Sequence, residues 1–188
     1  MAKSMILSAL ALAATVSAHG NITSPPARLP GQAMVAACGQ AAVDSVLRDG
    51  TLPIESVVNP AASCNLFLCR GALLEDNLDI VQTFSLGETI NLTAALPIPH
   101  EGPANVSIVL AATNEILGEP LLVFDSYADE RLAQLPANNT AFSVTIPGAG
   151  NGVEESCVKP GDCVLQWFWF GTGAQQTYES CVDFVIAS

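Results

Sequence analysis

The sequence predicts an all-β protein, an antiparallel immunoglobulin- or fibronectin-like β-sandwich with long N-terminal loops, short helices and disulfide bonds. Six segments between residues 87 and 186 have the alternating or apolar side chains of strands, and turn-forming residues separate them. Prolines are frequent in the first part of the chain, where we expect loops. An even number of cysteines behind an apolar N-terminal leader is typical of a disulfide-bonded extracellular domain.

Residues 1–18 have the anatomy of a secretory signal peptide. Lys3 precedes an apolar run from Met5 to Val16, and small residues stand at Val16 and Ala18, before the expected cut. The run is shorter than the roughly 20 residues of a membrane span. We therefore expect a secreted, extracellular chain of residues 19–188, forming a single domain with no linker and no extra binding module.

The segment that follows the leader reads largely as loop. Residues 24–53 contain four prolines, which fix the backbone and interrupt regular structure. We expect one short helix around residues 32–47, where alanine and valine dominate. Residues 53–80 read as irregular.

The remaining chain has the pattern of strands, and no repeat or linker divides it. We expect strands at residues 87–94, 104–111, 121–124, 141–146, 163–170 and 178–186. Side chains alternate across a strand, so Trp167 and Trp169 share one face. We expect both in the core and not on a surface platform for sugars.

All six cysteines are predicted to form disulfides: Cys38, Cys64, Cys69, Cys157, Cys163 and Cys181. Six cysteines allow 15 pairings. The turn-rich segment between Cys157 and Cys163 favours a local bridge, and Cys181 is expected to join the last strand to one of the three N-terminal cysteines. A zinc site is disfavoured because the Cys64-x4-Cys69 pair lacks a second pair at suitable spacing.

The charge balance restricts the partners. The net charge is −12, with 18 acidic residues against six basic ones. Nucleic acids and anionic membranes are recognised by basic patches, so we expect neither as a partner. The composition suits a soluble monomer that acts beside a neutral substrate.

His19 is the most informative residue, because a cut after Ala18 makes it the N-terminus. It then offers two ligands, its α-amine and a ring nitrogen. The only other histidine, His100, lies in a loop that Pro99 and Pro103 stiffen. Three nitrogens suit copper. The alternative for His100 is an exposed loop histidine without a ligand role.

Two further side chains on the last strand are candidates. Gln176 and Tyr178 share one face, because residues two apart in a strand point the same way. The alternative for Tyr178 is a core residue whose hydroxyl is hydrogen-bonded.

Four N-x-S/T sequons, at Asn21, Asn91, Asn105 and Asn138, fit the secretory route and predict a glycoprotein. We expect Asn21 to be bare, because a glycan there would obstruct His19.

Four motifs in order carry a resemblance over nearly the whole chain after the leader: residues 25–40, 102–109, 161–169 and 176–184. With His19 at the start and His100 in its loop, they resemble the lytic polysaccharide monooxygenases. The most similar group is fungal, auxiliary-activity family sixteen, whose members carry a chitin-binding type-4 domain description.

The resemblance implies one copper per chain. His19 would bind it through the α-amine and Nδ1, and His100 through Nε2. Tyr178 would lie weakly bound on the axial side, and Gln176 would donate a hydrogen bond to the oxygen species. The implied reaction hydroxylates a C–H bond of a crystalline, insoluble polysaccharide, cellulose at C1 above all, with an external electron donor and O2 or H2O2.

Three alternatives stay open: a chitin-active monooxygenase, a non-oxidative copper-binding protein with the same ligands, and a cell-wall carbohydrate-binding protein. Hydrolytic enzymes are disfavoured, since no nucleophile motif accompanies His100.

Overall fold

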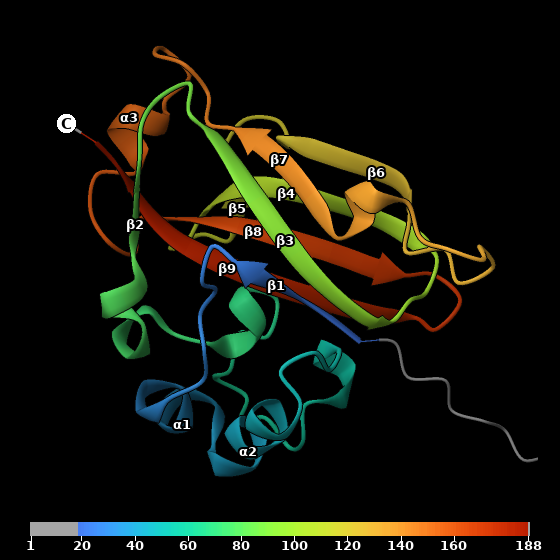
Figure 1. Cartoon of the computed structure of the whole chain (residues 1–188). Coiled ribbons are helices and arrows are strands. Elements are labelled where there is room, and N and C mark those ends of the chain that lie inside the picture. Colours follow the sequence, from blue (N-terminus) through green and yellow to red (C-terminus); the bar gives the residue numbers. More distant parts are fainter. Residues whose placement is uncertain (1–18, 188) are drawn as a thin grey trace, which may run out of the picture.

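A computed structural model describes residues 19–187. Two β-sheets pack face to face, and the helices and turns of residues 32–80 gather on one side of them, next to β1 and β9 (Figure 1). The proposed signal peptide, residues 1–18, lies outside the described residues. Within residues 19–187, no helix is long and apolar enough to cross a membrane.

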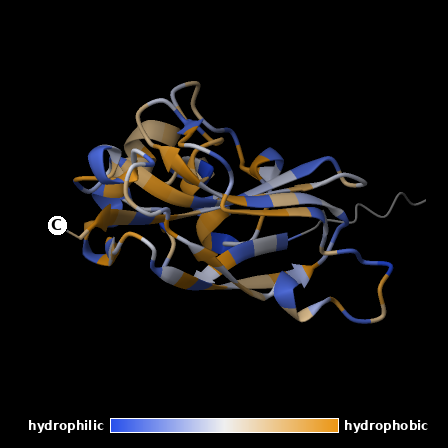
Figure 2. Cartoon of the chain, turned by 90° about the horizontal axis from the view of Figure 1, so that it is seen from above, coloured by the Kyte–Doolittle hydropathy of each residue, from blue (hydrophilic) through white to orange (hydrophobic). Residues whose placement is uncertain are grey.

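The smaller sheet has the strand order β1-β3-β7 and the larger one the order β2-β9-β8-β4-β5, with β6 paired to β4. The strands are β1 (His19–Ser24), β2 (Gln82–Phe84), β3 (Thr89–Ile98), β4 (Gly102–Leu110), β5 (Glu115–Ile116), β6 (Leu122–Tyr127), β7 (Ala141–Thr145), β8 (Cys163–Gly171) and β9 (Gln176–Ile186). Figure 2 shows hydrophobic and hydrophilic residues alternating along the strands, as a two-layer sandwich requires.

The predicted sandwich is confirmed, and each of the six expected strands is present. Three further strands, β1, β2 and β5, were not predicted from the sequence. One pairing also departs from the antiparallel prediction, because β2 runs parallel to β9. The missed strands are short or lack alternation: β1 has Ile22 as its one large apolar side chain.

The single helix expected at residues 32–47 is wrong, because two helices occupy the segment: α1 (Gln32–Cys38) and α2 (Gln40–Arg48). Gly39 separates them with a φ of 89°, a backbone angle that glycine adopts without steric cost. The carboxylate of Asp76 accepts hydrogen bonds from the backbone nitrogens of Ala33 and Met34, both at 2.9 Å, and so caps α1 from a distant loop.

The other helical elements are single turns: η1 (Ile54–Ser56), η2 (Cys69–Gly71), η3 (Leu74–Asp76), η4 (Leu78–Ile80), η5 (Ala137–Asn139) and α3 (Val153–Ser156). Four of these lie in the region predicted to be irregular.

The main core lies between the sheets and is rich in aromatic rings. Trp167, Trp169, Tyr127, Tyr178 and Phe184 are fully buried. The prediction that both tryptophans belong to the core is confirmed. Large rings bury much apolar area each, so this cluster contributes strongly to stability.

Three disulfides tie the loops to the sandwich. Cys38 pairs with Cys64, Cys69 with Cys181, and Cys157 with Cys163. The local bridge and a bridge from Cys181 to an N-terminal cysteine are therefore both present. The bridge from Cys69 spans 112 residues of sequence and fastens the irregular segment to β9.

A buried ion pair fastens the loop after β1 to the same strand. The guanidinium of Arg28 donates to both carboxylate oxygens of Asp183, at 2.6 and 2.7 Å, and also to the carbonyl of Ala72 at 3.0 Å. The Arg28 and Asp183 side chains are 4% and 0% exposed. The two parallel hydrogen bonds set the relative orientation of the Arg28 and Asp183 side chains and strengthen the attraction between their charges.

We expect Asp183→Asn to destabilise the protein, because it leaves the charge of Arg28 buried without a partner. The free energy of unfolding should fall by about 3–5 kcal/mol. Chemical denaturation followed by tryptophan fluorescence measures this change. Asp129→Asn is the matched control, since its partner Arg131 has a side chain 72% exposed, and its effect should be small. Equal shifts in the two variants would contradict the proposed role of the buried pair.

Candidate functional site

The two histidines lie at one end of the three-stranded sheet. His19 begins β1, and its backbone is opposite Ile98, the last residue of β3. His100 follows two residues later along the chain. Strand pairing therefore brings both histidines to the same rim of the sandwich, although 81 positions separate them in the sequence.

The ring of His19 is held by a carboxylate. Its Nε2 lies 2.7 Å from Oδ2 of Asp49, and Oδ1 of Asp49 accepts hydrogen bonds from the backbone nitrogen and hydroxyl of Thr51 at 2.9 and 2.6 Å. Partial burial raises the pKa of Asp49, but the hydrogen bonds from Thr51 and the interaction with His19 outweigh it, so the pKa is lowered. Oδ2 of Asp49 accepts a hydrogen bond from Nε2–H of His19, and in this tautomer Nδ1 is the nitrogen that can donate an electron pair.

The backbone next to His19 is fixed against the core. The nitrogen of Gly20 donates to the carbonyl of Thr51 at 2.9 Å. A Cβ atom at Gly20 would lie 3.0 Å from the ring of Trp169 and 3.2 Å from that of Trp167. This close approach requires glycine at position 20 and places the start of β1 directly over the tryptophans.

His100 is 8% exposed, and its Nε2 is a buried atom with no hydrogen-bond partner. Its carbonyl accepts a hydrogen bond from Nε1 of Trp169 at 3.2 Å, and its Nδ1 lies 3.9 Å from Oε1 of Glu130. The alternative of an exposed loop histidine is therefore wrong. Buried polar atoms in native proteins nearly always have a partner, so an unpaired imidazole nitrogen calls for a ligand.

Glu130 is itself positioned by the loop that carries His100. Its Oε2 accepts a hydrogen bond from the backbone nitrogen of Glu101 at 2.6 Å. Hydrogen bonds from its own backbone nitrogen and from that of Glu101 lower the pKa of Glu130. A negative charge on the Nδ1 side of His100 favours a proton on that nitrogen, which leaves Nε2 as the electron-pair donor.

Tyr178 lies beneath the histidines in the core. It is fully buried and stacks on Trp169, with 4.4 Å between ring centroids and 25° between planes. Its hydroxyl donates to Oε1 of Gln176 at 2.7 Å. Burial, and then the negative charges of Glu55 and Asp49, raise the pKa of Tyr178. The hydroxyl therefore stays protonated and orients the amide of Gln176.

Contacts link most of the predicted residues. Tyr178 joins Gln176 by a hydrogen bond and Trp169 by stacking, and Trp169 joins His100 by a hydrogen bond. His19 reaches this group through Gly20, which packs on Trp169. The ligand and donor roles of these residues stay predictions.

Sequence reasoning missed Asp49 and Glu130. Neither lies near a histidine in the sequence, and no motif marks either one. Among residues 19–187, no three or more His, Cys, Asp or Glu side chains form a metal-binding group. The predicted site has a different donor set, since it counts the α-amine that a cut after Ala18 would free.

No family model matches the chain, and no curated protein matches its sequence. Similar solved structures include the following three. The cellulose-active LPMO CelS2 in complex with copper is 14% identical, with a TM-score of 0.48, over 89% of this chain and 98% of that one. A chitin binding domain from Burkholderia pseudomallei is 12% identical, with a TM-score of 0.44, over 90% and 100%. Lytic polysaccharide monooxygenase AA15 from Thermobia domestica, in the Cu(I) state, is 19% identical, with a TM-score of 0.44, over 90% and 99%.

We expect neither tyrosine of the folded chain to ionise near its ordinary pKa of about 10. Burial raises the pKa of Tyr127 as it does that of Tyr178, and the chain has no third tyrosine. The unfolded chain releases these protons first, so stability should fall as the pH rises above about 10. Ultraviolet titration of phenolate absorbance measures the ionisation of both tyrosines. In Tyr178→Phe the remaining signal comes from Tyr127 alone. Phenolate forming near the ordinary pKa while circular dichroism still reports the native fold would contradict the burial of these hydroxyls.

Proposed function

We propose that the chain is a secreted, copper-dependent polysaccharide monooxygenase of the lytic type. The observation that carries the proposal is the buried Nε2 of His100, which has no partner and lies at the same rim as His19. Imidazole nitrogens are good copper ligands. Coordination would satisfy an atom whose burial otherwise costs free energy.

One copper ion would be held by the α-amine and Nδ1 of His19 and by Nε2 of His100. Tyr178 would border the bound copper. Two carboxylates support this donor set. Asp49 contacts Nε2 of His19, and Glu130 faces Nδ1 of His100, so each carboxylate lies at the ring nitrogen that would not bind copper. Metal-binding histidines in proteins nearly always have such a partner on the second ring nitrogen.

Bound copper would supply the one-electron chemistry needed to hydroxylate an unactivated C–H bond, with an external electron donor and O2 or H2O2. The chain's own residues position the participants. Asp49 holds the ring of His19 in one tautomer and orientation. The hydroxyl of Tyr178 donates a hydrogen bond to Oε1 of Gln176 and so orients that amide, whose NH2 group would donate a hydrogen bond at the site.

The substrate would be an insoluble, neutral polysaccharide. The chain has an excess of acidic residues, which disfavours polyanionic glycans. Cellulose with oxidation at C1 is the substrate that the resemblance to auxiliary-activity family sixteen favours, and chitin is the alternative. We expect contact with the polysaccharide through hydrogen bonds from the loops around His19 and His100.

Copper binding tests the site directly. Intact mass of the secreted chain, before and after loading with Cu(II) and treatment with EDTA, should give an N-terminus at His19 and one copper. His100→Ala should lose the copper. A different N-terminus, or no retained copper, would remove both the monooxygenase and the copper-carrier proposals and leave a carbohydrate-binding protein.

Asp49→Asn should weaken copper binding by about 10- to 100-fold, because the carboxylate that orients His19 is lost. Asp44→Asn is the matched control: Asp44 is an exposed carboxylate on α2 that accepts a hydrogen bond from Gln40. Competition titration against a copper chelator measures both affinities. Equal affinities in the two variants would show that Asp49 does not support the site.

Activity separates the remaining candidates. With a reductant, the copper-loaded chain should release C1-oxidised oligosaccharides from cellulose, detected by mass spectrometry, and chitin should be assayed in parallel. Oxidised products from chitin alone would identify chitin, and not cellulose, as the substrate. Tight copper binding without oxidised products from either polymer would favour the non-oxidative copper protein.

A further inference from the structure

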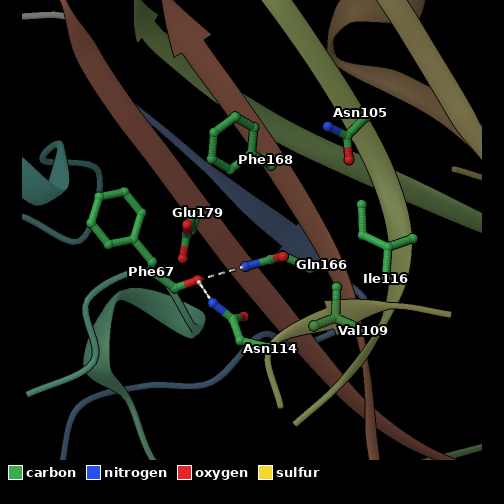
Figure 3. Close-up of a pocket in the computed structure, with 8 residues that line it drawn as sticks. All are labelled: Phe67, Asn105, Val109, Asn114, Ile116, Gln166, Phe168 and Glu179. Carbon is green, nitrogen blue, oxygen red and sulfur yellow. Dashed lines mark hydrogen bonds between the residues drawn. The ribbon is translucent and has the colours of Figure 1, made fainter.

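A separate pocket of about 280 Å³ lies on the outer face of the larger sheet. Across the β4–β8 pairing, Asn105 is opposite Phe168 and Ser107 is opposite Gln166. Trp167 and Trp169, the alternate residues of β8, point into the core, so Gln166 and Phe168 face outward. Phe67, from the loop before η2, forms the opposite wall (Figure 3).

The buried side of the pocket contains a carboxyl group with an unpaired oxygen. Glu179 is 1% exposed, and its Oε2 has no hydrogen-bond partner. Burial raises the pKa of Glu179 to about 7, although the nearby Arg70 opposes that shift. The guanidinium of Arg70 donates hydrogen bonds to three backbone carbonyls, those of Gly50, Leu52 and Glu179.

Three amide side chains line the same pocket. Nδ2 of Asn114 and Nε2 of Gln166 both donate to the carbonyl of Phe67, at 3.1 and 3.5 Å. Oδ1 of Asn105 accepts the hydroxyl of Ser107 at 2.9 Å. Figure 3 shows the amide nitrogen of Asn105 turned toward Phe168. The amides are thus held in fixed orientations around the cavity.

This combination suits an uncharged ring that carries hydroxyl groups. The phenyl rings of Phe67 and Phe168 offer apolar faces for C–H groups, and Phe67 is 58% exposed. Amides and a carboxyl group can each pair with hydroxyls, and a neutral acid can also donate. The volume of about 280 Å³ lies just below the range for drug-sized small-molecule sites, about 300–1,000 Å³.

We propose that this pocket binds a single pyranose ring, a neutral hexose or N-acetylhexosamine. The ring could belong to a free saccharide or to a glycan on the chain itself, because Asn105-Val106-Ser107 is a glycosylation sequon whose asparagine lines the pocket. The proposal does not depend on copper, since none of its residues belongs to the histidine site.

The test uses the copper-free mature chain produced without glycosylation in a bacterial host. Titration with glucose and with N-acetylglucosamine is followed by ¹H–¹⁵N NMR. One of them should give saturable shifts of the side-chain amides of Asn105, Asn114 and Gln166. The absence of saturable shifts with both sugars would overturn the proposal.

Phe67→Ala should weaken binding by about five- to tenfold, because it removes one apolar wall. Because the ring of Phe67 is largely exposed, its removal should leave the fold intact. Leu47→Ala, a similarly exposed apolar residue on α2 at 63%, is the control and should bind as the parent chain does. Equal binding by Phe67→Ala and the parent would place the sugar elsewhere and overturn the assignment.

A second preparation, secreted from a eukaryotic host, distinguishes the two sources of the ring. Peptide mass spectrometry reports the glycan at Asn105, and the same titration reports the pocket. A glycosylated Asn105 with a pocket that no longer responds to free sugar identifies the chain's own glycan as the occupant. A bare Asn105 with an unchanged titration identifies a free saccharide.

Discussion

The backbone pairing of β9 with β8 is the constraint on which the rest of the molecule depends. It runs without a register shift from Cys163 opposite Phe184 to Gly171 opposite Gln176. Residues of β9 then fasten separate parts of the chain: Ser180 accepts from the backbone nitrogen of Ile22 in β1, Cys181 forms a disulfide, and Asp183 pairs with Arg28. A slip of one residue would turn each of these side chains to the opposite face. The positions of both histidines relative to Tyr178 follow from this register.

Two carboxylates illustrate how surroundings decide charge in this acidic protein. Asp49 is partly exposed and accepts three hydrogen bonds or close contacts from Thr51 and His19, so its pKa falls. Glu179 is deeply buried with one oxygen unpaired, so its pKa rises. Hydrogen bonds to the charged form and loss of solvent act in opposite directions. The first arrangement suits a group that orients a base, and the second suits a group that can donate a hydrogen bond to a hydroxyl.

The sequence predicts the sandwich well because its long strands alternate clearly, as β3 and β7 do. It predicts β1 poorly, since HGNITS contains one large apolar residue and is held by pairing with β3 and by Ser180. The break between α1 and α2 depends on the backbone at Gly39, which no periodicity reveals. His19 was found from its position behind the leader and His100 from its stiff loop. Asp49, Glu130 and the outer pocket come from contacts distant in sequence, and no local pattern encodes them.

The bridge between Cys69 and Cys181 has a consequence for how the outer pocket is held together. Phe67 is two residues from Cys69 and Glu179 is two residues from Cys181, so the bridge ties together the two walls that face each other. Val109 and Val164 pack around it beneath the pocket. The bridge therefore supplements the hydrogen bonds that Asn114 and Gln166 donate to the carbonyl of Phe67. Disulfides form and persist in oxidising compartments, so oxidation of these two thiols adds a covalent link between the opposite walls of the cavity.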